Sequence, residues 1–232
     1  MKLAVFGANG PTGRLLTELA LDEEHDVVAF TRHPDAFPIE HRRLEVVAGD
    51  VHDAAAVASA IDGVDAVVST LGVPFAKSPV TVYSGGVTNI MAGMHAGGVK
   101  RLVCVSSSAI GPHPEPLGGL VFERIIQPYV VKRLGRTLYE DMRRMEAMVI
   151  DSDLAWTIVR PSGLFEAPTV SAYAVAIDYF GHRFTARIDL ADCLLRHALD
   201  DTHVRSTIAV ATPSAKPSML KLVWQEGIRK KT

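Results

Sequence analysis

The sequence contains only two cysteines, Cys104 and Cys193, among its 232 residues. Two thiols cannot form the network of disulfides that stabilises small secreted proteins, so a disulfide-rich scaffold is excluded. Cys104 lies in an apolar run, where we expect a buried free thiol. The cysteine content therefore favours a reducing compartment, and we expect a cytoplasmic protein.

Long hydrophobic runs, an excess of one charge and metal-ligand spacings are also missing. The first apolar run stops at Asn9 and Gly10, too soon for a signal peptide or a membrane-spanning helix. A formal net charge of -2 indicates neither a nucleic acid nor an anionic membrane as a partner. The nine histidines are scattered without the spacing of metal ligands, so we predict no metal site.

The remaining composition is typical of a globular enzyme. Hydrophobic residues make up 48% of the sequence, and the chain has no internal repeat, low-complexity tract or linker. A chain of 232 residues is long enough for one α/β domain with a sizeable core and too short for two. We therefore predict a single domain over residues 1–232.

Three evenly spaced glycines follow the first predicted strand. Residues 3–6 form a short apolar run, as in strands buried on both faces of a parallel sheet, and apolar residues recur at helical spacing after Gly13. At such a strand-to-helix turn, Gly7 permits the bend, Gly10 lets backbone N–H groups approach a phosphate, and Gly13 lets the helix pack closely. The pattern predicts a pyrophosphate site at the helix N-terminus, with a plain glycine-rich loop as the alternative.

The second predicted strand, residues 26–31, ends at Arg32. In dinucleotide-binding folds an acidic side chain at this strand end accepts hydrogen bonds from the adenosine 2′-OH. This sequence has Thr31, Arg32 and His33 instead. Because a cation suits a 2′-phosphate and a carboxylate would repel it, we predict NADP(H) rather than NAD(H) as the cofactor. The alternative is a solvated arginine at a strand end.

Two motifs resemble a known family. The spacing Gly7-x-x-Gly10-x-x-Gly13 is similar to the variant found in extended and atypical short-chain dehydrogenase/reductases. The run from Asp151 to Pro161 resembles the stretch S-x-L-x-W-T-I-x-R-P of atypical short-chain reductases. These include the biliverdin-type flavin reductases and the fungal nitrogen regulator. The resemblance covers residues 2 to about 199.

The resemblance implies an α/β fold of the Rossmann type, with a doubly wound parallel sheet and small capping segments at about 111–135 and 164–186. Apolar patterns place strands at 3–6, 26–31, 44–48, 65–69, 101–105, 155–159 and 207–210, and helices at 54–61, 80–95, 136–151 and 218–226. Asp53 and Asp189 are expected helix N-caps.

The motifs and the resemblance together give a set of cofactor contacts. Asp50 matches a motif whose carboxylate binds near the adenine. Thr70-Leu71-Gly72 matches a turn that lines the cofactor, and Pro161 matches a position against the nicotinamide amide. The cofactor-binding residues predicted in this way are Gly7, Asn9, Gly10, Pro11, Thr12, Gly13, Arg32, Asp50, Val51, Thr70, Leu71, Gly72, Ser106 and Pro161.

Candidate catalytic residues follow the fifth strand and lie in the helix at 136–151. Ser107 and Ser108 lie where the superfamily has a catalytic or substrate-orienting hydroxyl, although serines at a strand end also cap and turn the chain. Tyr139 is followed four residues later by Arg143, where typical short-chain dehydrogenases have Tyr-x-x-x-Lys. An arginine binds with a different geometry, so Tyr139 is either a proton donor or an ordinary half-exposed helix residue.

The resemblance implies an NADPH-dependent reductase that transfers hydride to a small conjugated acceptor, such as a flavin or quinone. Aromatic residues within 164–185 are expected either to line that pocket or to be ordinary core. Two other classes fit the motifs: a non-catalytic NADP(H)-sensing regulator and an NAD(P)-dependent isomerase or epimerase. We expect a monomer or homodimer whose partner is a small molecule.

Overall fold

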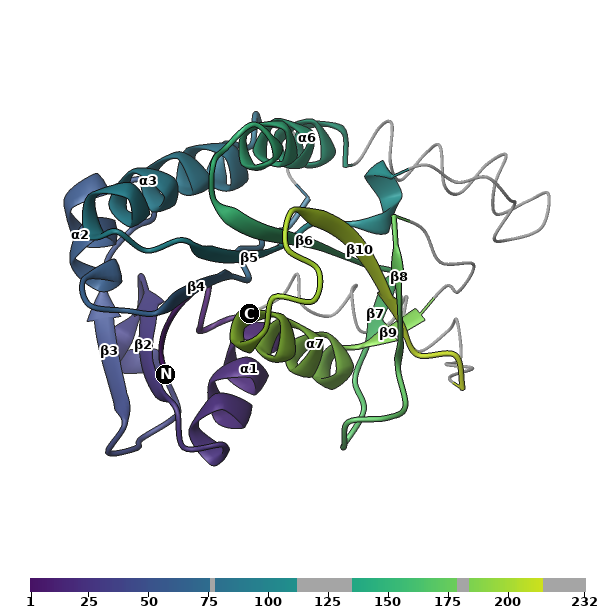
Figure 1. Ribbon diagram of the computed structural model, residues 1–232, viewed down its shortest axis with the longest axis horizontal. Helices are drawn as coiled ribbons and strands as arrows, with labels where there is room; N and C mark the ends of the chain where they lie inside the picture. Colours follow the sequence, from purple (N-terminus) through teal and green to yellow (C-terminus); the bar gives the residue numbers. More distant parts are fainter. Residues whose placement is uncertain (76–77, 112–134, 179–183, 215–232) are drawn as a thin grey trace.

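The computed structural model describes residues 1–75, 78–111, 135–178 and 184–214 (Figure 1). Its main sheet has the strand order β3-β2-β1-β4-β5-β6-β10-β8, with only β8 antiparallel to its neighbour. The strands are β1 (Lys2–Phe6), β2 (Asp26–Thr31), β3 (Leu44–Ala48), β4 (Ala66–Ser69), β5 (Arg101–Val105), β6 (Ala155–Pro161), β8 (Ala174–Ile177) and β10 (Ser206–Ala211). This order is that of a doubly wound Rossmann sheet with two further strands on one side.

Helices cover both faces of this sheet (Figure 1). One face carries α2 (Ala54–Ile61), α3 (Val82–Gly97) and α6 (Arg136–Ile150), and the other carries α1 (Pro11–Asp22) and α7 (Arg187–Leu199). Short 3-10 turns, η1 (Pro34–Ala36) and η2 (Ser108–Ile110), follow β2 and β5. Among the described residues, none of these helices combines the length and apolarity that crossing a membrane requires.

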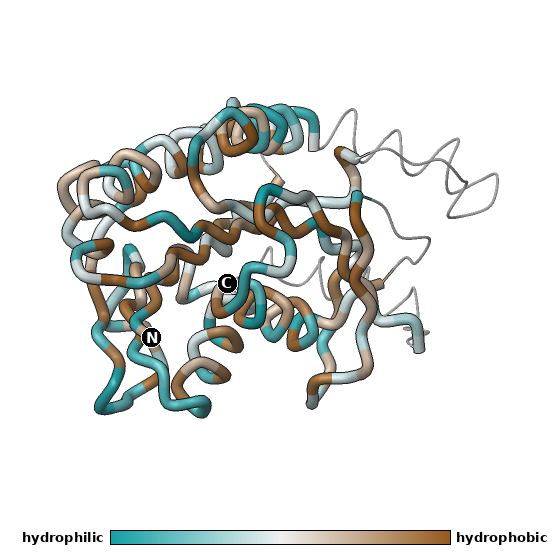
Figure 2. The backbone as a smooth tube through the Cα atoms, viewed as in Figure 1, coloured by the Kyte–Doolittle hydropathy of each residue, from teal (hydrophilic) through white to brown (hydrophobic). Residues whose placement is uncertain are grey.

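The central strands are hydrophobic along their whole length because both of their faces are buried. In β1, Leu3 and Val5 pack under α1 and α7, whereas Ala4 and Phe6 pack under the helices of the opposite face, and all four are 0% exposed. Figure 2 shows this continuous hydrophobic band through the middle of the sheet. A buried parallel strand therefore reads as an unbroken apolar run rather than as an alternating pattern.

The structure confirms the predicted parallel sheet and most element positions. Asp53 caps α2 by accepting hydrogen bonds from the N–H groups of Ala55 and Ala56. The expected cap at Asp189 is wrong: the N-cap of α7 is Ala186, and Asp189 is the third residue of the helix, within its first turn. The predicted helix at 218–226 lies outside the described residues.

Three short strands were not predicted. Besides β8, the parallel pair β7 (Gly163–Phe165) and β9 (Phe184–Ala186) forms a second, two-stranded sheet. Strands of three or four residues are too short to show a reliable hydrophobic period, which explains why the sequence pattern missed them. All three belong to the segment that was expected to cap the substrate pocket.

Asp141 joins α6 to the beginning of α3. Its side chain is completely buried and accepts hydrogen bonds from Tyr83 N (2.9 Å), Ser84 N (3.3 Å) and the Ser84 hydroxyl. The two N–H groups donate to Oδ2, and Arg144 Nη2 donates at 3.0 Å to Oδ1, which also accepts from the Ser84 hydroxyl. These contacts satisfy N–H groups in the first turn of α3, which have no partner within the helix. Asp141 thus performs from α6 the capping that Thr81, the N-cap residue of α3, does not provide.

We expect Asp141→Ala to lower the free energy of unfolding by about 2–4 kcal/mol, because buried N–H donors and the Arg144 guanidinium lose their acceptor. Urea titration followed by circular dichroism measures this change. The matched control is Glu140→Ala, which removes an exposed i,i+4 ion pair with Arg136 and should cost less than about 0.5 kcal/mol. Equal effects of the two substitutions would contradict the role assigned to Asp141.

Candidate functional site

The turn between β1 and α1 has no room for side chains at two of its glycines. Gly7 has a φ of +79°, and a Cβ there would lie 2.7 Å from the Thr70 carbonyl oxygen. A Cβ at Gly13 would lie 2.3 Å from the Gly7 carbonyl oxygen and 2.7 Å from Ala8 Cα. Both obstacles are backbone atoms, which cannot rotate away. The glycines are therefore required for the bend and for the close packing of α1.

The first turn of α1 presents unpaired N–H groups at this bend. Its N-cap is Gly10, which has no side chain to accept from them, and Pro11 occupies the first helical position. The N–H groups of Thr12 and Gly13 have no carbonyl partner within the helix, and the helix dipole is positive here. Backbone of this shape, with no Cβ in front of it, fits a diphosphate. The geometry thus agrees with the predicted cofactor cradle.

Thr70 ties this turn to the end of β4. Its hydroxyl donates to the carbonyl oxygens of Phe6 (3.0 Å) and Gly7 (3.2 Å), and its N–H donates to Phe6 O at 2.8 Å. The strand order reverses between β1 and β4, because the chain builds β2 and β3 on one side before it returns to the other. Ligands bind at such a switch point, at the carboxyl ends of the strands. Leu71 and Gly72 continue along this edge.

Arg32 and Asn9 lie beside the turn on its β2 side. Arg32 is exposed and forms no hydrogen bond or ion pair with any other described residue. Asn9 donates from Nδ2 to the carbonyl oxygen of His33 at 3.5 Å. Its Oδ1 accepts hydrogen bonds from Arg14, which was not among the predicted site residues. The signal for Arg14 in the sequence is a basic residue directly after Gly13.

Asp50 and Val51 follow β3 at the same edge. Asp50 accepts a hydrogen bond from His52 N at 2.9 Å through Oδ1, which fixes the turn and leaves Oδ2 without a partner among the described residues. Val51 is buried, and its carbonyl oxygen accepts from Asn89 Nδ2 at 2.9 Å. Asn89 on α3 therefore holds in place the loop that was predicted to meet the adenine.

The three serines after β5 have different environments. Ser106 is 2% exposed, and its hydroxyl has no hydrogen-bond partner among the described residues. Ser107 is the N-cap of η2 and accepts from Ala109 N at 3.2 Å. Ser108 begins η2 and is half-buried. The capping role foreseen as an alternative thus belongs to Ser107, whereas the hydroxyls of Ser106 and Ser108 form no hydrogen bond with another described residue.

Tyr139 and Arg143 do not form a pair. Tyr139 is half-buried in the first turn of α6, with its ring against Gly135 and 6.2 Å from the ring of Phe75. Arg143 is exposed and has no ion-pair partner among the described residues. Its guanidinium forms no hydrogen bond or ion pair with a described residue, so the structure gives no support to the idea that Arg143 replaces the lysine of the Tyr-x-x-x-Lys motif.

A buried ion pair lies at the carboxyl ends of β5 and β6. Arg160 Nε and Nη2 donate to the two oxygens of Glu146, at 2.9 Å and 2.6 Å, and both residues are nearly buried. Sheet register places Arg160 beside Ser106, just before Pro161. Burial, followed by the nearby Glu146 charge, raises the pKa of the Cys104 thiol, so this cysteine is no nucleophile. In the sequence, Arg160 is recognisable only as part of the motif that ends at Pro161.

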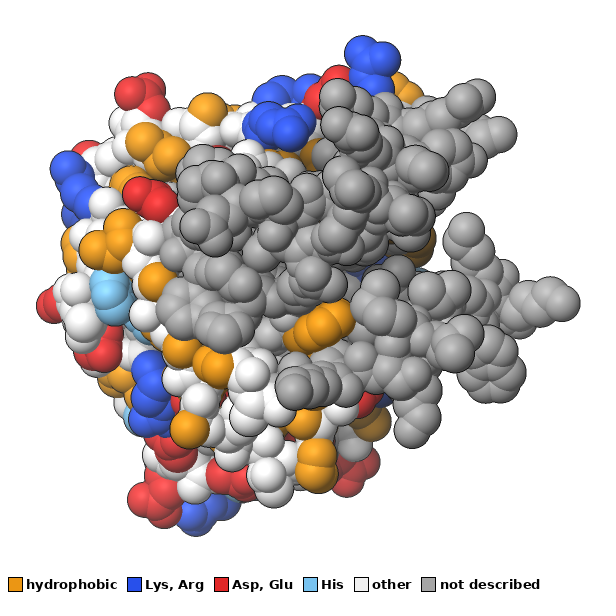
Figure 3. All heavy atoms as spheres, turned by 90° about the vertical axis from the view of Figure 1, so that its right-hand side faces the viewer, with side chains coloured by type: hydrophobic (Ala, Val, Ile, Leu, Met, Phe, Trp, Pro, Cys, Tyr) orange, Lys and Arg blue, Asp and Glu red, His pale blue; other side chains and the backbone are white. Residues whose placement is uncertain are grey.

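The expected capping segments are only partly described. Residues 112–134 of the first, and Tyr179 and Phe180 of the second, lie outside the described residues. Tyr173 is not a pocket residue: its hydroxyl donates to Asp192 at 2.7 Å and its ring packs on the α1–α7 side of the sheet. On the face shown in Figure 3, acidic and basic side chains of described residues are interspersed, without an extended patch of one charge.

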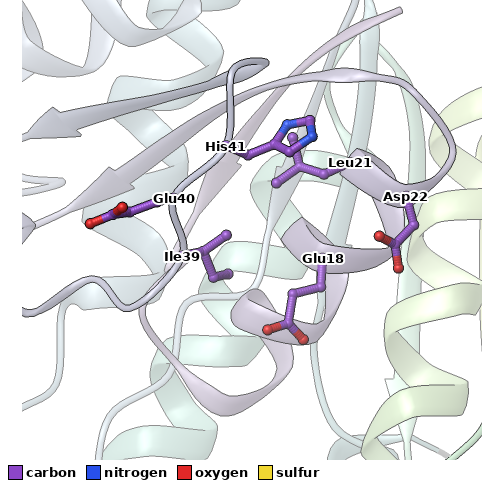
Figure 4. A pocket seen from close by; sticks show the side chains of 6 residues that line it. All are labelled: Glu18, Leu21, Asp22, Ile39, Glu40 and His41. Atoms are coloured by element: carbon purple, nitrogen blue, oxygen red, sulfur yellow. The ribbon is translucent and has the colours of Figure 1, made fainter.

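A pocket of about 340 Å³ lies elsewhere, between the end of α1 and the loop before β3 (Figure 4). It is lined by Glu18, Leu21, Asp22, Ile39, Glu40 and His41. This pocket is at the opposite end of α1 from the glycine turn. Its three carboxylates would repel a phosphate, so it does not compete as the nucleotide site. No cluster of metal ligands is present among the described residues.

The switch-point turn and the doubly wound sheet together define a dinucleotide-binding Rossmann domain. The family model described as NAD(P)H-binding matches residues 7–202, and the chain belongs to this family.

Several proteins of known sequence are similar to the chain. It is 28% identical over 213 residues to the uncharacterized sugar epimerase YhfK of Bacillus subtilis, covering 89% of this chain and 91% of YhfK. A 3 beta-hydroxysteroid dehydrogenase/Delta 5-->4-isomerase of Mycobacterium tuberculosis is 31% identical over 120 residues, which is 47% of this chain and 32% of the enzyme. An uncharacterized Mycobacterium bovis protein is 36% identical over 108 residues, so the match spans 46% of this chain and only 12% of that protein.

Solved structures share the fold over nearly the whole chain. A short-chain dehydrogenase/reductase from Veillonella parvula in complex with NADP superposes with a TM-score of 0.76 at 18% identity, covering 94% of this chain and 99% of that one. ChuY, an anaerobilin reductase from Escherichia coli O157:H7, gives a TM-score of 0.71 at 23% identity, covering 94% of this chain and 100% of ChuY. These similarities establish the Rossmann architecture.

We expect Gly13→Ala to reduce nucleotide affinity at least tenfold, because the new methyl group must push α1 away from the Gly7 carbonyl. Isothermal titration calorimetry with NADPH measures this loss, and thermal unfolding reports any accompanying destabilisation. Gly97→Ala is the control, since its Cβ would meet only Val99 Cγ2 at 3.7 Å and alanine is favoured in helices. Full NADPH affinity in Gly13→Ala would show that the close packing is not needed.

Proposed function

We propose that this protein is an NADPH-dependent reductase that transfers hydride to a small conjugated acceptor, such as a flavin or quinone. The observation that carries the cofactor choice is Arg32, an exposed guanidinium without a described partner at the end of β2, where NAD(H)-binding proteins have a carboxylate. Membership of the NAD(P)H-binding family supports the nucleotide itself. The NADP bound to the Veillonella protein and the reductase activity named for ChuY support the choice by similarity.

In this proposal the chain's residues bind and orient. The Gly7–Gly13 turn and the start of α1 hold the pyrophosphate, Arg32 holds the 2′-phosphate, and Asp50 meets the adenine. Thr70-Leu71-Gly72 and Pro161 line the nicotinamide half, beside the buried Ser106. NADPH supplies the hydride when bound. Fixing the acceptor against it in a reactive geometry is the protein's main contribution to rate.

The acceptor side uses the remaining candidates. Ser108, whose hydroxyl is uncommitted, orients the acceptor at the end of β5, and Ser107 supports it by fixing the η2 turn. Tyr139 is the candidate proton donor, since it lies with Phe75 at the beginning of α6. A phenol within hydrogen-bond reach of the acceptor delivers the proton that balances hydride transfer. The Phe75 ring, 42% exposed, adds a flat apolar surface of the kind that aromatic acceptors favour.

One observation favours a second function. Arg143, at the position of the lysine that activates tyrosine in typical short-chain dehydrogenases, is exposed and forms no ion pair with a described residue. A regulator that binds NADP(H) and signals its redox state would need the nucleotide cradle and no proton donor. Steady consumption of NADPH with any acceptor excludes this reading.

An isomerase or epimerase is the third class, favoured by the similarity to YhfK over most of both chains. Such an enzyme would convert its substrate without net oxidation of NADPH. A reductase and an isomerase or epimerase are therefore distinguished by following NADPH absorbance and substrate composition in the same reaction.

We expect Arg32→Gln to raise the dissociation constant of NADPH about tenfold to a hundredfold, since one charge-assisted contact is worth about 1.5–3 kcal/mol. The affinity for NADH, which has no 2′-phosphate, should change less than about twofold. Calorimetric titration of both nucleotides measures the ratio. Wild-type protein that binds NADH and NADPH equally well would contradict the role given to Arg32.

We expect Tyr139→Phe to lower kcat about a hundredfold or more with the best acceptor of a panel of flavins, quinones, azo dyes and tetrapyrroles. NADPH absorbance reports the rate, and NADPH affinity should stay the same. Tyr173→Phe is the matched control, because its hydroxyl is bound to Asp192 on the other side of the sheet. An unchanged kcat in Tyr139→Phe would make solvent the proton source.

A further inference from the structure

Arg14 is held over the glycine turn by Asn9. Its Nε donates to Asn9 O at 3.1 Å and to Asn9 Oδ1 at 3.0 Å, and its Nη2 donates to the same Oδ1 at 2.6 Å. Asn9 in turn donates from Nδ2 to the carbonyl oxygen of His33. One asparagine therefore connects the guanidinium at the start of α1 to the loop that follows β2, directly beside Arg32.

The two guanidiniums at this corner lack counter-charges. Neither Arg14 nor Arg32 forms an ion pair with a carboxylate of the described residues, and Asp35, the acidic residue of the η1 turn, pairs with neither. The contacts of Arg14 are to neutral oxygens only. Both hydrogens of its Nη1 are without a described acceptor. Asn9 contacts Arg14 directly and, through His33 O, the loop that carries Arg32, so an anion bound beside Asn9 would be attracted by both cations.

We propose that Arg14 is a second ligand of the adenosine 2′-phosphate and that Asn9 is the residue that positions it. The inference rests on the proposed function, because it assigns a further contact to the same nucleotide. Asn9 occupies one edge of the guanidinium, Nε and Nη2, which leaves Nη1 for a second acceptor. A phosphate dianion between Arg14 and Arg32 receives hydrogen bonds from both sides. Asn9 itself then acts through Arg14 rather than on the phosphate.

A purely structural role for Arg14 predicts something different. If its bonds to Asn9 served only to hold the turn, losing them would weaken NADH and NADPH binding equally, since both share the pyrophosphate. A ligand of the 2′-phosphate affects NADPH alone. The ratio of the two dissociation constants therefore separates the roles, independently of catalysis.

The test uses the full chain and four variants, Arg14→Gln, Arg14→Lys, Asn9→Ala and Arg42→Gln. Dissociation constants are measured by calorimetry for NADPH and NADH, and for the fragments 2′,5′-ADP and 5′-AMP. Arg42→Gln is the matched control: it removes the same charge from an exposed residue without a described ion pair, before β3 at the far end of the sheet. Thermal unfolding verifies that each variant is folded.

We expect Arg14→Gln to weaken NADPH and 2′,5′-ADP about tenfold, equivalent to about 1.4 kcal/mol, with NADH and 5′-AMP changed less than about twofold. Arg14→Lys should recover part of the loss, because it keeps a point charge without the planar fork. Asn9→Ala should weaken NADPH about threefold, since the charge remains but its orientation is lost. Arg42→Gln should leave all four constants unchanged.

Parallel losses for NADPH and NADH in Arg14→Gln would overturn the inference and leave Arg14 as a brace of the turn. An unchanged NADPH affinity would overturn it as well. In both cases the proposed function survives, provided that the wild-type chain binds NADPH more tightly than NADH. A wild-type chain that binds neither nucleotide would instead contradict the proposed function itself.

Discussion

The contact between Gly13 and the Gly7 carbonyl is the constraint on which the nucleotide site depends. Helix α1 lies so close to the turn that a single methyl group at Gly13 would overlap backbone. That closeness brings the positive end of the helix over the carboxyl end of β1, where an anion can meet its N–H groups. Thr70 then fixes the same turn to β4. The cradle is therefore built from backbone and one hydroxyl, without any charged side chain.

Charged side chains lie at both ends of the proposed site, but only those at one end are neutralised by an ion pair. At the proposed adenosine end, Arg14 and Arg32 form no ion pair with a described carboxylate. At the carboxyl ends of β5 and β6, Arg160 is matched by Glu146 in a buried bidentate pair. Desolvation offsets most of the attraction in such a pair, so its contribution is fixed geometry more than stability. One end can thus attract an anion, whereas the other presents a neutral, ordered surface beside Ser106.

The sequence predicted the structure best at positions where local sterics or burial allow only one type of residue. Glycines with no space for a Cβ, continuous apolar strands and the Asp53 cap were all predictable, because each follows from local sterics or burial. Asp189 shows where prediction fails, and Arg143 shows where the sequence leaves a role open. Whether a helix residue faces its partner depends on helix rotation against the sheet, and Asp189 serves Ser171 and Thr212, contacts that only the tertiary fold brings together.

The same limit applied to the buried charges. Glu146 and Arg160 are 14 residues apart in the sequence, and no spacing rule links a helix residue to a residue on the following strand. Asp141 likewise caps a helix that begins 59 positions earlier. Arg14 directly follows Gly13 in the sequence. Its proposed contact with the nucleotide depends on Asn9, which contacts the loop after β2. Contacts between elements, rather than patterns within them, decided these roles.

The arrangement of α6 restricts the chemistry that the proposed reductase can carry out. Its buried face is apolar apart from Asp141 and Glu146, whose carboxylates accept hydrogen bonds from other elements, and Arg143 is exposed. Reducing an isolated carbonyl develops a strongly basic alkoxide, which requires a well-placed acid in the transition state. Reducing a conjugated acceptor spreads the new charge over the ring system, so a tyrosine without an adjacent cation suffices as the proton donor. A site that binds and orients without an activated tyrosine is therefore suited to conjugated acceptors, which is why the structure of α6 and the proposed substrate class agree.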